Sequence, residues 1–220
     1  VRPPGFCTGC PERPVFTAIK LVEKEVGEIH VSADIGCHTF STLPPFNIGN
    51  SVLGYGLGLA SAAGVAPAFG DKRVVSIMGD GGLWHNGLTS GIAGAVFNKS
   101  DSVLIIMNNG YSSATGQQHI PSTGTNFRLE PTGQNIREAL KGLGVKWQRT
   151  VTTYEVRTMM KTLREALTTP TKGLEVIIAE SECQLAKQRR ARPLLRKKLE
   201  RGERLIRTRF GVDDDVCTGD

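Results

Sequence analysis

Apolar residues recur along this chain in two alternating patterns. Short, near-continuous apolar runs predict strands, which we expect over residues 29–33, 73–78, 102–107, 145–149 and 174–179. Helical spacing of apolar residues predicts helices over 14–26, 51–66, 87–97, 136–143 and 154–167. Strands that alternate with helices in this way predict an α/β fold, a doubly wound and mostly parallel sheet with helices on both faces.

One long stretch carries no charge. There is no Asp, Glu, Lys or Arg between Asp34 and Asp71, and residues 52–69 are apolar or small enough to resemble a membrane span. Gly and Ala dominate that segment and Pro67 interrupts it. We therefore expect a helix buried on all sides in a protein core or subunit interface, and no membrane association.

The length and composition, 220 residues with 39% hydrophobic side chains, predict one domain over 1–185 and a tail over 186–220. Residues 187–209 hold eleven Lys or Arg against two Glu, so this segment carries +9 and the remaining residues −3, against +6 for the whole chain. No nucleic-acid-binding motif accompanies the basic run. We expect the tail to pack on its own subunit or on an acidic partner, with no nucleic acid bound.

The five cysteines come without a signal-peptide pattern. We therefore expect a cytoplasmic protein whose reduced cysteines serve metal or redox chemistry. Cys7 and Cys10 form a C-x-x-C pair, which by itself also suits zinc or a redox dithiol. Cys37 and Cys183 are the further candidates within the domain. Four thiolates can hold a [4Fe–4S] cluster, although Cys37 and Cys183 are also compatible with small buried residues.

Polar residues directly follow two of the predicted core strands. The strand over 73–78 runs into GDGG at 79–82, the strand over 102–107 runs into Asn108-Asn109, and 26 residues separate Gly81 from Asn108. Ligands bind at the carboxyl ends of such strands, so a carboxylate and a carboxamide arrive side by side. Mg²⁺ prefers these oxygens and takes its other ligands from phosphate and water. Glycines let backbone N–H groups approach a diphosphate, so the pattern favours a Mg²⁺–diphosphate site over two simple turns.

The two motifs together resemble the thiamine diphosphate signature, in which GDG is followed, after one helix and one strand, by NN. The resemblance implies that Mg²⁺ is held by Asp80, Asn109 and the backbone carbonyl of Tyr111. It also implies that the cofactor lies against Gly79, Asp80, Gly81 and Gly82.

Five segments in order resemble the thiamine diphosphate domain of the 2-oxoacid:ferredoxin oxidoreductases, most closely the indolepyruvate ferredoxin oxidoreductase α subunits: PPGFCTGCPERPVF, ADIGCHTF, GDGGLWHNGLTSGIAGAVFNKSD, NNGYSSATGQQHIPSTGTN and IIAESECQL. The resemblance covers residues 2 to about 185 and implies cofactor contacts at Thr115 and Gly116. It also implies a [4Fe–4S] cluster on Cys7, Cys10, Cys37 and Cys183. Cys217 is similar to the first ligand of a ferredoxin-like module, so we expect the chain to be a fragment.

The resemblance implies oxidative decarboxylation of indolepyruvate, or another aryl pyruvate, to an acyl-CoA with electrons passed to ferredoxin. The implied partners are the 2-oxoacid, coenzyme A, ferredoxin, the other domains of the same subunit and a second oxidoreductase subunit in an oligomer. In that family, the Glu that activates the aminopyrimidine ring belongs to another domain. Two departures leave the identity of the 2-oxoacid open, because Glu12 stands where relatives usually have His and their GDS is GDG here.

Three histidines lie in these segments. His38 and His85 are candidates for catalytic or orienting roles, as is His119, and a structural role is equally compatible with each.

Three other functions compete with the leading one. One is the same machinery acting on pyruvate, 2-oxoglutarate or an arylglyoxylate. Another is a non-oxidative thiamine diphosphate decarboxylase or synthase, which has no use for the four cysteines. The third is a basic nucleic-acid-binding or assembly module, which leaves the GDG and NN spacing unexplained.

Overall fold

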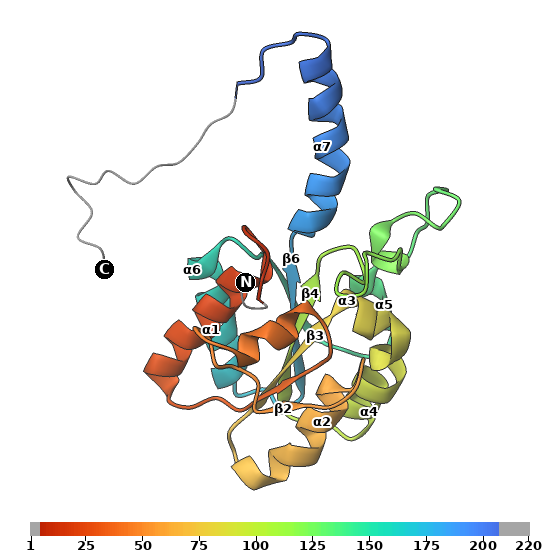
Figure 1. Ribbon diagram of the computed structural model, residues 1–220. Coiled ribbons are helices and arrows are strands. Elements are labelled where there is room, and N and C mark those ends of the chain that lie inside the picture. The colour runs from red at the N-terminus through yellow and green to blue at the C-terminus, as the bar shows by residue number, and fades with distance from the viewer. Residues whose placement is uncertain (1–4, 207–220) are drawn as a thin grey trace, which may run out of the picture. The chain divides into compact units, whose positions relative to one another are not determined.

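Six strands form one sheet in the spatial order β2-β1-β3-β4-β6-β5, and every neighbouring pair is parallel. The strands are β1 (Val31–Ala33), β2 (Ser51–Val52), β3 (Val74–Gly79), β4 (Ser102–Asn108), β5 (Trp147–Thr152) and β6 (Leu174–Glu180). The expected doubly wound sheet is confirmed, and it is fully rather than mostly parallel (Figure 1).

The structure, a computed structural model, describes residues 5–206 of the chain. The chain divides into two compact units, Val1–Ala186 and Lys187–Asp220. Cys217, expected to begin a further cluster motif, lies outside the described residues. No helix among residues 5–206 is long and apolar enough to cross a membrane.

Helices cover both faces of the sheet. The helical elements of the first unit are α1 (Glu12–Val26), η1 (Cys37–Thr42), α2 (Gly58–Val65), η2 (Ala66–Phe69), α3 (Asp80–Gly82), η3 (Leu83–Ala93), α4 (Gly94–Phe97), η4 (Pro121–Thr123), α5 (Ile136–Gly142) and α6 (Val156–Thr168). The helices α1 and α6 pack against each other on one face, and α2, η3, α4 and α5 lie on the other (Figure 1).

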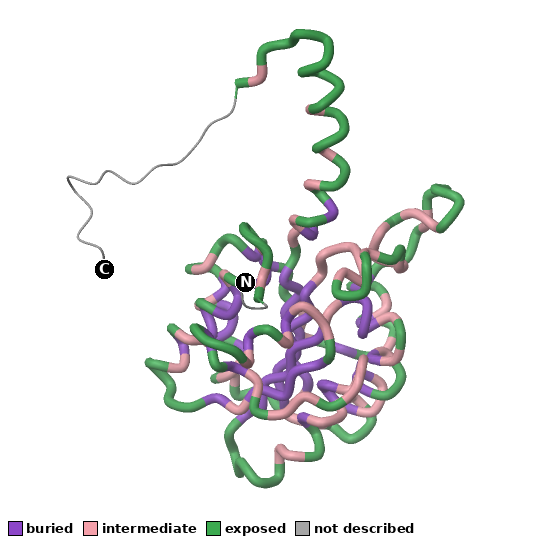
Figure 2. The backbone as a smooth tube through the Cα atoms, viewed as in Figure 1, coloured by how far each residue is buried: buried purple, intermediate pink, exposed green. Residues whose placement is uncertain are grey.

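The core follows from the alternation of side chains along each strand. On β4, Val103, Ile105 and Met107 belong to the apolar cluster with α1 and α6, whereas Leu104 and Ile106 belong to the cluster with α2, η3 and α5. All five side chains are at most 1% exposed, and each such burial stabilises the fold by roughly 1.5–3 kcal/mol. Figure 2 shows this buried centre as the purple strands between the helical layers.

Two of the expected helices differ most from the structure. The helix expected over 51–66 begins only at Gly58, because Ser51 and Val52 pair with β1 as a strand. Gly56, at a φ of +81°, then turns the chain and donates its N–H to Asp34. The outer face of this helix, with Ala63 and Gly64, is exposed in the single chain, so its burial on all sides, which would then need a subunit interface, stays a prediction.

The helix expected over 87–97 starts earlier than its apolar spacing indicated. It begins with α3 at Asp80, directly after β3, and continues as the π-helical segment η3 to Ala93. At Gly87 this π-helical segment packs closely against β3, because a Cβ there would lie 2.4 Å from the sulfur of Met78. Helical periodicity therefore missed the very turn that carries the site residues.

Parallel strands bring their following loops to one edge of the sheet. The register pairs Gly79 with Met107 and Asn108 with Glu180, so β3, β4 and β6 end at one level. The loops that begin at Asp80, Asn109 and Ser181 therefore open on the same side.

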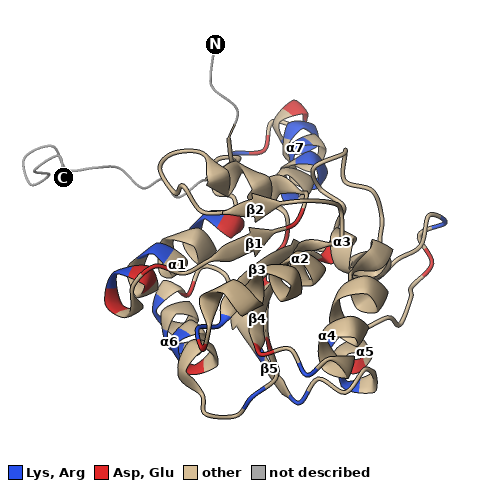
Figure 3. Ribbon diagram, turned by 90° about the horizontal axis from the view of Figure 1, so that it is seen from below, with Lys and Arg blue, Asp and Glu red and all other residues tan. Residues whose placement is uncertain are grey.

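The second unit contains most of the helix α7 (Gln184–Glu200), in which Lys and Arg predominate (Figure 3). An i,i+4 ion pair between Arg196 and Glu200, with 2.9 Å between Nε and Oε1, supports its last turns. No strand is found within residues 187–206.

Candidate functional site

A pocket at the carboxyl edge of the sheet collects most of the predicted cofactor residues. We call it the aspartate pocket, and it is lined by Glu12, Ile35, Gly36, Cys37, His38, Tyr55, Gly79, Asp80, Gly81, Gly82, Asn109, Tyr111, Ser112, Ser113 and Ala114. The GDGG and NN motifs thus meet in one place, as their positions after neighbouring strands predicted.

Asp80 is the most enclosed carboxylate of this pocket. Its side chain is 1% exposed, with Oδ1 accepting from the N–H of Gly81 at 3.0 Å and Oδ2 accepting from the N–H of Gly110 at 2.7 Å. Burial raises the pKa of Asp80 to about 7 in spite of these backbone donors. A cation bound beside such a carboxylate stabilises its ionised form, because the cation offsets the free-energy cost of the buried charge.

The glycines of the motif are required by close packing. A Cβ on Gly81 would lie 2.3 Å from the Tyr55 hydroxyl, and one on Gly82 would lie 2.2 Å from Oδ2 of Asp34. Both distances are far below van der Waals contact. Any other residue at either position would displace the neighbouring side chain.

Asn109, and not Asn108, points into the aspartate pocket. The Asn108 side chain turns outward, and its Nδ2 donates to Glu180 at 2.8 Å. Oδ1 of Asn109 accepts from the N–H of Tyr111 at 3.2 Å and from the hydroxyl of Ser113 at 2.9 Å. The three predicted metal ligands, Asp80, Asn109 and Tyr111, therefore line the same pocket.

Thr115 and Gly116 lie in the turn that follows the pocket wall. This turn is closed by the bridge between Ser112 and Gln118, and the Thr115 hydroxyl donates to Gln118 at 2.7 Å. Both residues are exposed and neither lines the aspartate pocket. Their predicted cofactor contacts stay predictions.

The histidines occupy three different environments. His38 is 2% exposed and lines the pocket, burial lowers its pKa to about 4, and its Nε2 has no hydrogen-bond partner among residues 5–206. His85 is exposed, and its ring lies 5.1 Å from the ring of Tyr55 at an interplanar angle of 39°. His119 is also exposed, 6.0 Å from the ring of Tyr111. Only His38 therefore presents an unpartnered nitrogen from within the pocket wall.

Sequence reasoning missed two acids at this edge. Asp34 directly follows β1 and is fully buried, with Oδ1 accepting from the N–H groups of Ile35 and Gly56, both at 2.7 Å. Burial raises the pKa of Asp34 to about 6. Glu12 is 3% exposed, and burial followed by the nearby Asp80 carboxylate raises its pKa to about 8. The position of Asp34 after a predicted strand was a usable signal, whereas nothing in the sequence placed Glu12 opposite Asp80.

A second pocket, which we call the cysteine pocket, adjoins the first. It is lined by Gly5, Phe6, Cys7, Cys10, Pro11, Glu12, Cys37, Phe40, Asn109, Ser113, Cys183, Gln184 and Leu185. It therefore gathers the four predicted cluster cysteines, which are distant in sequence and all unpaired. Both pockets share Glu12, Cys37, Asn109 and Ser113.

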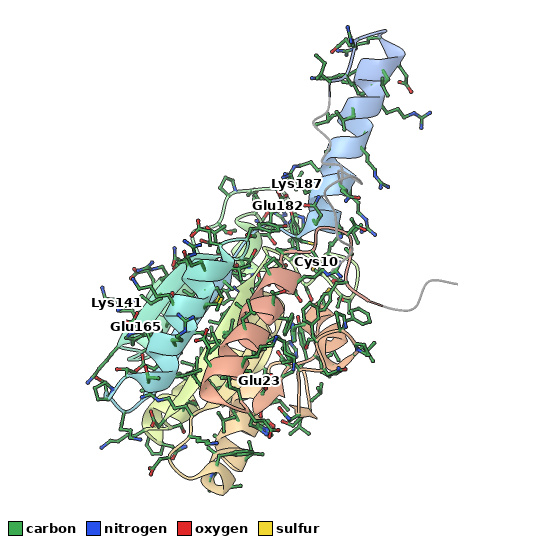
Figure 4. The ribbon with its side chains drawn as sticks, turned by 90° about the vertical axis from the view of Figure 1, so that its left-hand side faces the viewer. Cys10, Glu23, Lys141, Glu165, Glu182 and Lys187 are labelled. Carbon is green, nitrogen blue, oxygen red and sulfur yellow. The ribbon has the colours of Figure 1, made fainter. Side chains whose placement is uncertain are left out.

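Backbone hydrogen bonds hold the cysteine-bearing loops together. The N–H of Cys10 donates to the carbonyl of Cys7 at 3.0 Å, and the Tyr154 hydroxyl anchors this turn through the carbonyl of Gly9 at 2.8 Å. The N–H of Cys183 donates to the carbonyl of Asn109 at 3.0 Å. Figure 4 shows Cys10 at the start of α1.

The four thiols line one pocket but are not arranged in the geometry of a metal site. Burial raises the pKa of both Cys10 and Cys37 to about 12, with nearby Glu12 as the second cause. Within residues 5–206, no three Cys, His, Asp or Glu side chains stand close enough to hold a metal ion as they are. The donor types fit a [4Fe–4S] cluster, which deprotonates its thiol ligands, and the Asp80, Asn109 and carbonyl oxygens fit Mg²⁺.

The buried acids predict a pH-dependent stability of the metal-free protein. The pKa of Asp80 is about 7 in the folded chain and 3.8 as a free side chain. The contribution of Asp80 to the free energy of unfolding is therefore fully present below pH 4 and is lost as the pH rises through 7. Asp80→Asn, which keeps an acceptor oxygen, should therefore be more stable than wild type at pH 8 and about equal at pH 4. The difference should grow by about 1.4 kcal/mol per pH unit through this window. Thermal unfolding of both proteins in chelator checks this, and a difference independent of pH would contradict it.

Comparison with known proteins assigns the chain to a family. Residues 34–179 match the family model described as thiamine pyrophosphate enzyme, C-terminal TPP binding domain. The chain belongs to this family. Thiamine pyrophosphate is another name for thiamine diphosphate, the cofactor that the sequence predicted. The matched range contains Asp80, Asn109 and Cys37, but not Cys7, Cys10 or Cys183.

Curated relatives of the chain are named indolepyruvate oxidoreductase subunit IorA. The one from Archaeoglobus fulgidus is 34% identical over 185 residues, which cover 83% of this chain and 29% of the relative. The one from Methanothermobacter marburgensis is 29% identical over 190 residues, covering 84% and 30%. The chain therefore spans about 30% of the length of the curated relatives it matches.

Solved structures share the fold of this family member at low identity. The 2-oxoglutarate:ferredoxin oxidoreductase of Magnetococcus marinus matches with a TM-score of 0.66 at 20% identity, over 83% of this chain and 65% of that one. The thiamine diphosphate-dependent 4-hydroxybenzoylformate decarboxylase of Rhodococcus jostii matches with a TM-score of 0.55 at 20% identity, over 84% and 35%. These likenesses show the fold alone.

Proposed function

We propose that this chain is the Mg²⁺- and thiamine diphosphate-binding domain, residues 1–185, of a 2-oxoacid:ferredoxin oxidoreductase that acts on indolepyruvate. The observation that carries the proposal is the adjacency of the two pockets, one with Asp80 and Asn109 and one with four free cysteines. The proposed substrate comes from the name of the curated relatives, of which one is 34% identical.

Each group of residues has a distinct task in this proposal. Asp80, Asn109 and the Tyr111 carbonyl would hold Mg²⁺, with the glycines of 79–82 against the diphosphate. Cys7, Cys10, Cys37 and Cys183 would hold a [4Fe–4S] cluster for one-electron transfer. When bound, thiamine diphosphate supplies the carbanion that attacks the keto carbon and the electron sink that permits loss of CO₂.

Two histidines would orient ligands in this proposal. His38 is neutral at pH 7, since burial lowers its pKa to about 4, and its free Nε2 can hydrogen-bond a ligand in the aspartate pocket. His85 is exposed and packs its ring beside that of Tyr55, where a substrate or another domain would meet it. Both histidines would therefore touch a ligand. Neither is proposed as the acid that activates the cofactor.

The proposal extends to partners that lie outside this chain. The activating Glu, the ferredoxin-like module, a second subunit, coenzyme A and ferredoxin would complete a cytoplasmic, oligomeric enzyme. The basic segment over 187–209 would pack on its own or a partner subunit. Another 2-oxoacid, such as pyruvate, 2-oxoglutarate or an arylglyoxylate, is accommodated by the same arrangement.

A substrate panel tests the proposed reaction. The complete protein, prepared without oxygen, is mixed with indolepyruvate, pyruvate, 2-oxoglutarate or phenylglyoxylate, and ferredoxin reduction is followed by absorbance. We expect the highest kcat/KM for indolepyruvate and a requirement for coenzyme A. Release of CO₂ without reduction of ferredoxin would instead indicate a non-oxidative decarboxylase, the activity in the name of the Rhodococcus jostii neighbour.

A further inference from the structure

One buried carboxylate, Glu12, lies in the walls of both pockets. It is the first residue of α1, and Pro11 precedes it as the helix cap. An acidic side chain in a first helical turn is favoured by the helix dipole, which helps to keep this charge inside the protein. At 3% exposure, with Oε2 lacking any hydrogen-bond partner among residues 5–206, it is nonetheless a costly group to bury. Its position therefore needs an explanation beyond helix formation.

The contacts of Glu12 point to the Mg²⁺ ligands on one side and the cysteines on the other. Oε1 accepts a hydrogen bond from Nδ2 of Asn109 at 3.4 Å, from a residue 97 positions away in the sequence. The backbone N–H of Glu12 faces the sulfur of Cys10 and favours its thiolate. One residue at the start of α1 thus contacts both Asn109 and Cys10.

The hydrogen bond that Asn109 donates to Glu12 acts together with two donors to its Oδ1 to fix which way the carboxamide faces. With Nδ2 turned to Glu12, Oδ1 is turned to the N–H of Tyr111 and the hydroxyl of Ser113. This is the side of Tyr111, whose carbonyl is the third proposed Mg²⁺ ligand. A flipped amide would place an NH₂ group there, and NH₂ cannot ligate a cation.

We propose that Glu12 is a positioning residue that orients Asn109 so that its oxygen, and not its nitrogen, meets the divalent cation of the thiamine diphosphate site. The inference rests on the proposed function for the identity of that site. It adds a residue of α1 to a site otherwise built from the loops after β3 and β4. Residues that orient metal ligands typically change metal affinity by 10- to 100-fold when replaced. Because 3.4 Å is long for an N–H···O bond, we expect the lower end of this range.

Two matched variants separate an orienting role from a charge effect. Glu12→Met keeps the length and volume of the side chain but has no oxygen acceptor, whereas Glu12→Gln keeps the Oε1 acceptor and removes the charge. Both are tested in the complete protein, stripped of divalent metal. Mn²⁺ replaces Mg²⁺ as the probe, since carboxylate and carbonyl ligands suit both ions. The free Mn²⁺ is counted by EPR in the presence of thiamine diphosphate, and circular dichroism confirms that each variant is folded.

We expect Glu12→Met to weaken Mn²⁺ binding about tenfold and Glu12→Gln to stay within about twofold of wild type. Wild-type affinity in folded Glu12→Met would overturn the inference. Equal weakening in both variants would also overturn it, because the charge and not the acceptor would then matter. Wild-type protein that takes up no Mn²⁺ with thiamine diphosphate would instead reject the proposed function itself.

Discussion

Asp80→Ala should abolish the Mg²⁺-dependent binding of thiamine diphosphate by the complete protein. Asp80 is the one carboxylate among the three proposed ligands, and its two oxygens are held in place by the N–H groups of Gly81 and Gly110. Removing it leaves two neutral oxygens, which are too few to compete with water for a strongly hydrated ion. We expect at least about a 100-fold loss in affinity, larger than for any residue that acts indirectly.

Isothermal titration of thiamine diphosphate into metal-free protein, with and without Mg²⁺, measures this loss. Asp71→Ala is the matched control, because Asp71 is an exposed aspartate in the turn before β3. The mutation should not unfold the chain, since burial of Asp80 already disfavours its ionised form. An unchanged Mg²⁺-dependent affinity in folded Asp80→Ala would show that the metal ligands have been assigned wrongly.

The central strands of the sheet were predictable because they are buried on both faces. Continuous apolar runs such as 73–78 and 102–107 identify central strands without any knowledge of their neighbours. The edge strand β2 has only two residues and no such run, so the sequence offered nothing to distinguish it from the start of a helix. The early start of the helical segment at Asp80 was hidden because GDGG has poor helix propensity, and tertiary packing around Gly81 and Gly82 determines it instead.

The site was predictable only where its residues directly follow strands. Asp80 and Asn109 lie in the aspartate pocket because the parallel register ends β3 and β4 at one level. Glu12 was unpredictable by this rule, since it stands at the start of a helix and reaches the site through tertiary packing of α1. Thr115 was placed by resemblance alone, and the exposed turn that holds it offers no independent physical argument.

Cys10→Ser and Cys37→Ser should each remove about four irons per chain from the anaerobically prepared complete protein. The four cysteines come from three separate loops and line one pocket, an arrangement that a disulfide framework or isolated buried thiols would not require. The thiols of Cys10 and Cys37 are protonated in the metal-free chain, because burial raises the pKa of each to about 12. Cluster assembly must therefore release these protons, and a serine ligand cannot replace a soft thiolate at comparable affinity.

Iron and sulfide counting, followed by low-temperature EPR after dithionite reduction, measures the result. Cys183→Ser is the decisive variant, since Cys183 is the least exposed of the four and alone among them could be a small core residue. Ser113→Ala is the control, because Ser113 lines the same pocket without a thiol and should leave the iron content unchanged. Iron retained in Cys183→Ser would remove that residue from the ligand set. Stoichiometric zinc with no reducible iron centre in the wild-type protein would exclude the cluster. A non-oxidative decarboxylase would then fit the aspartate pocket better, because decarboxylation alone needs no electron acceptor.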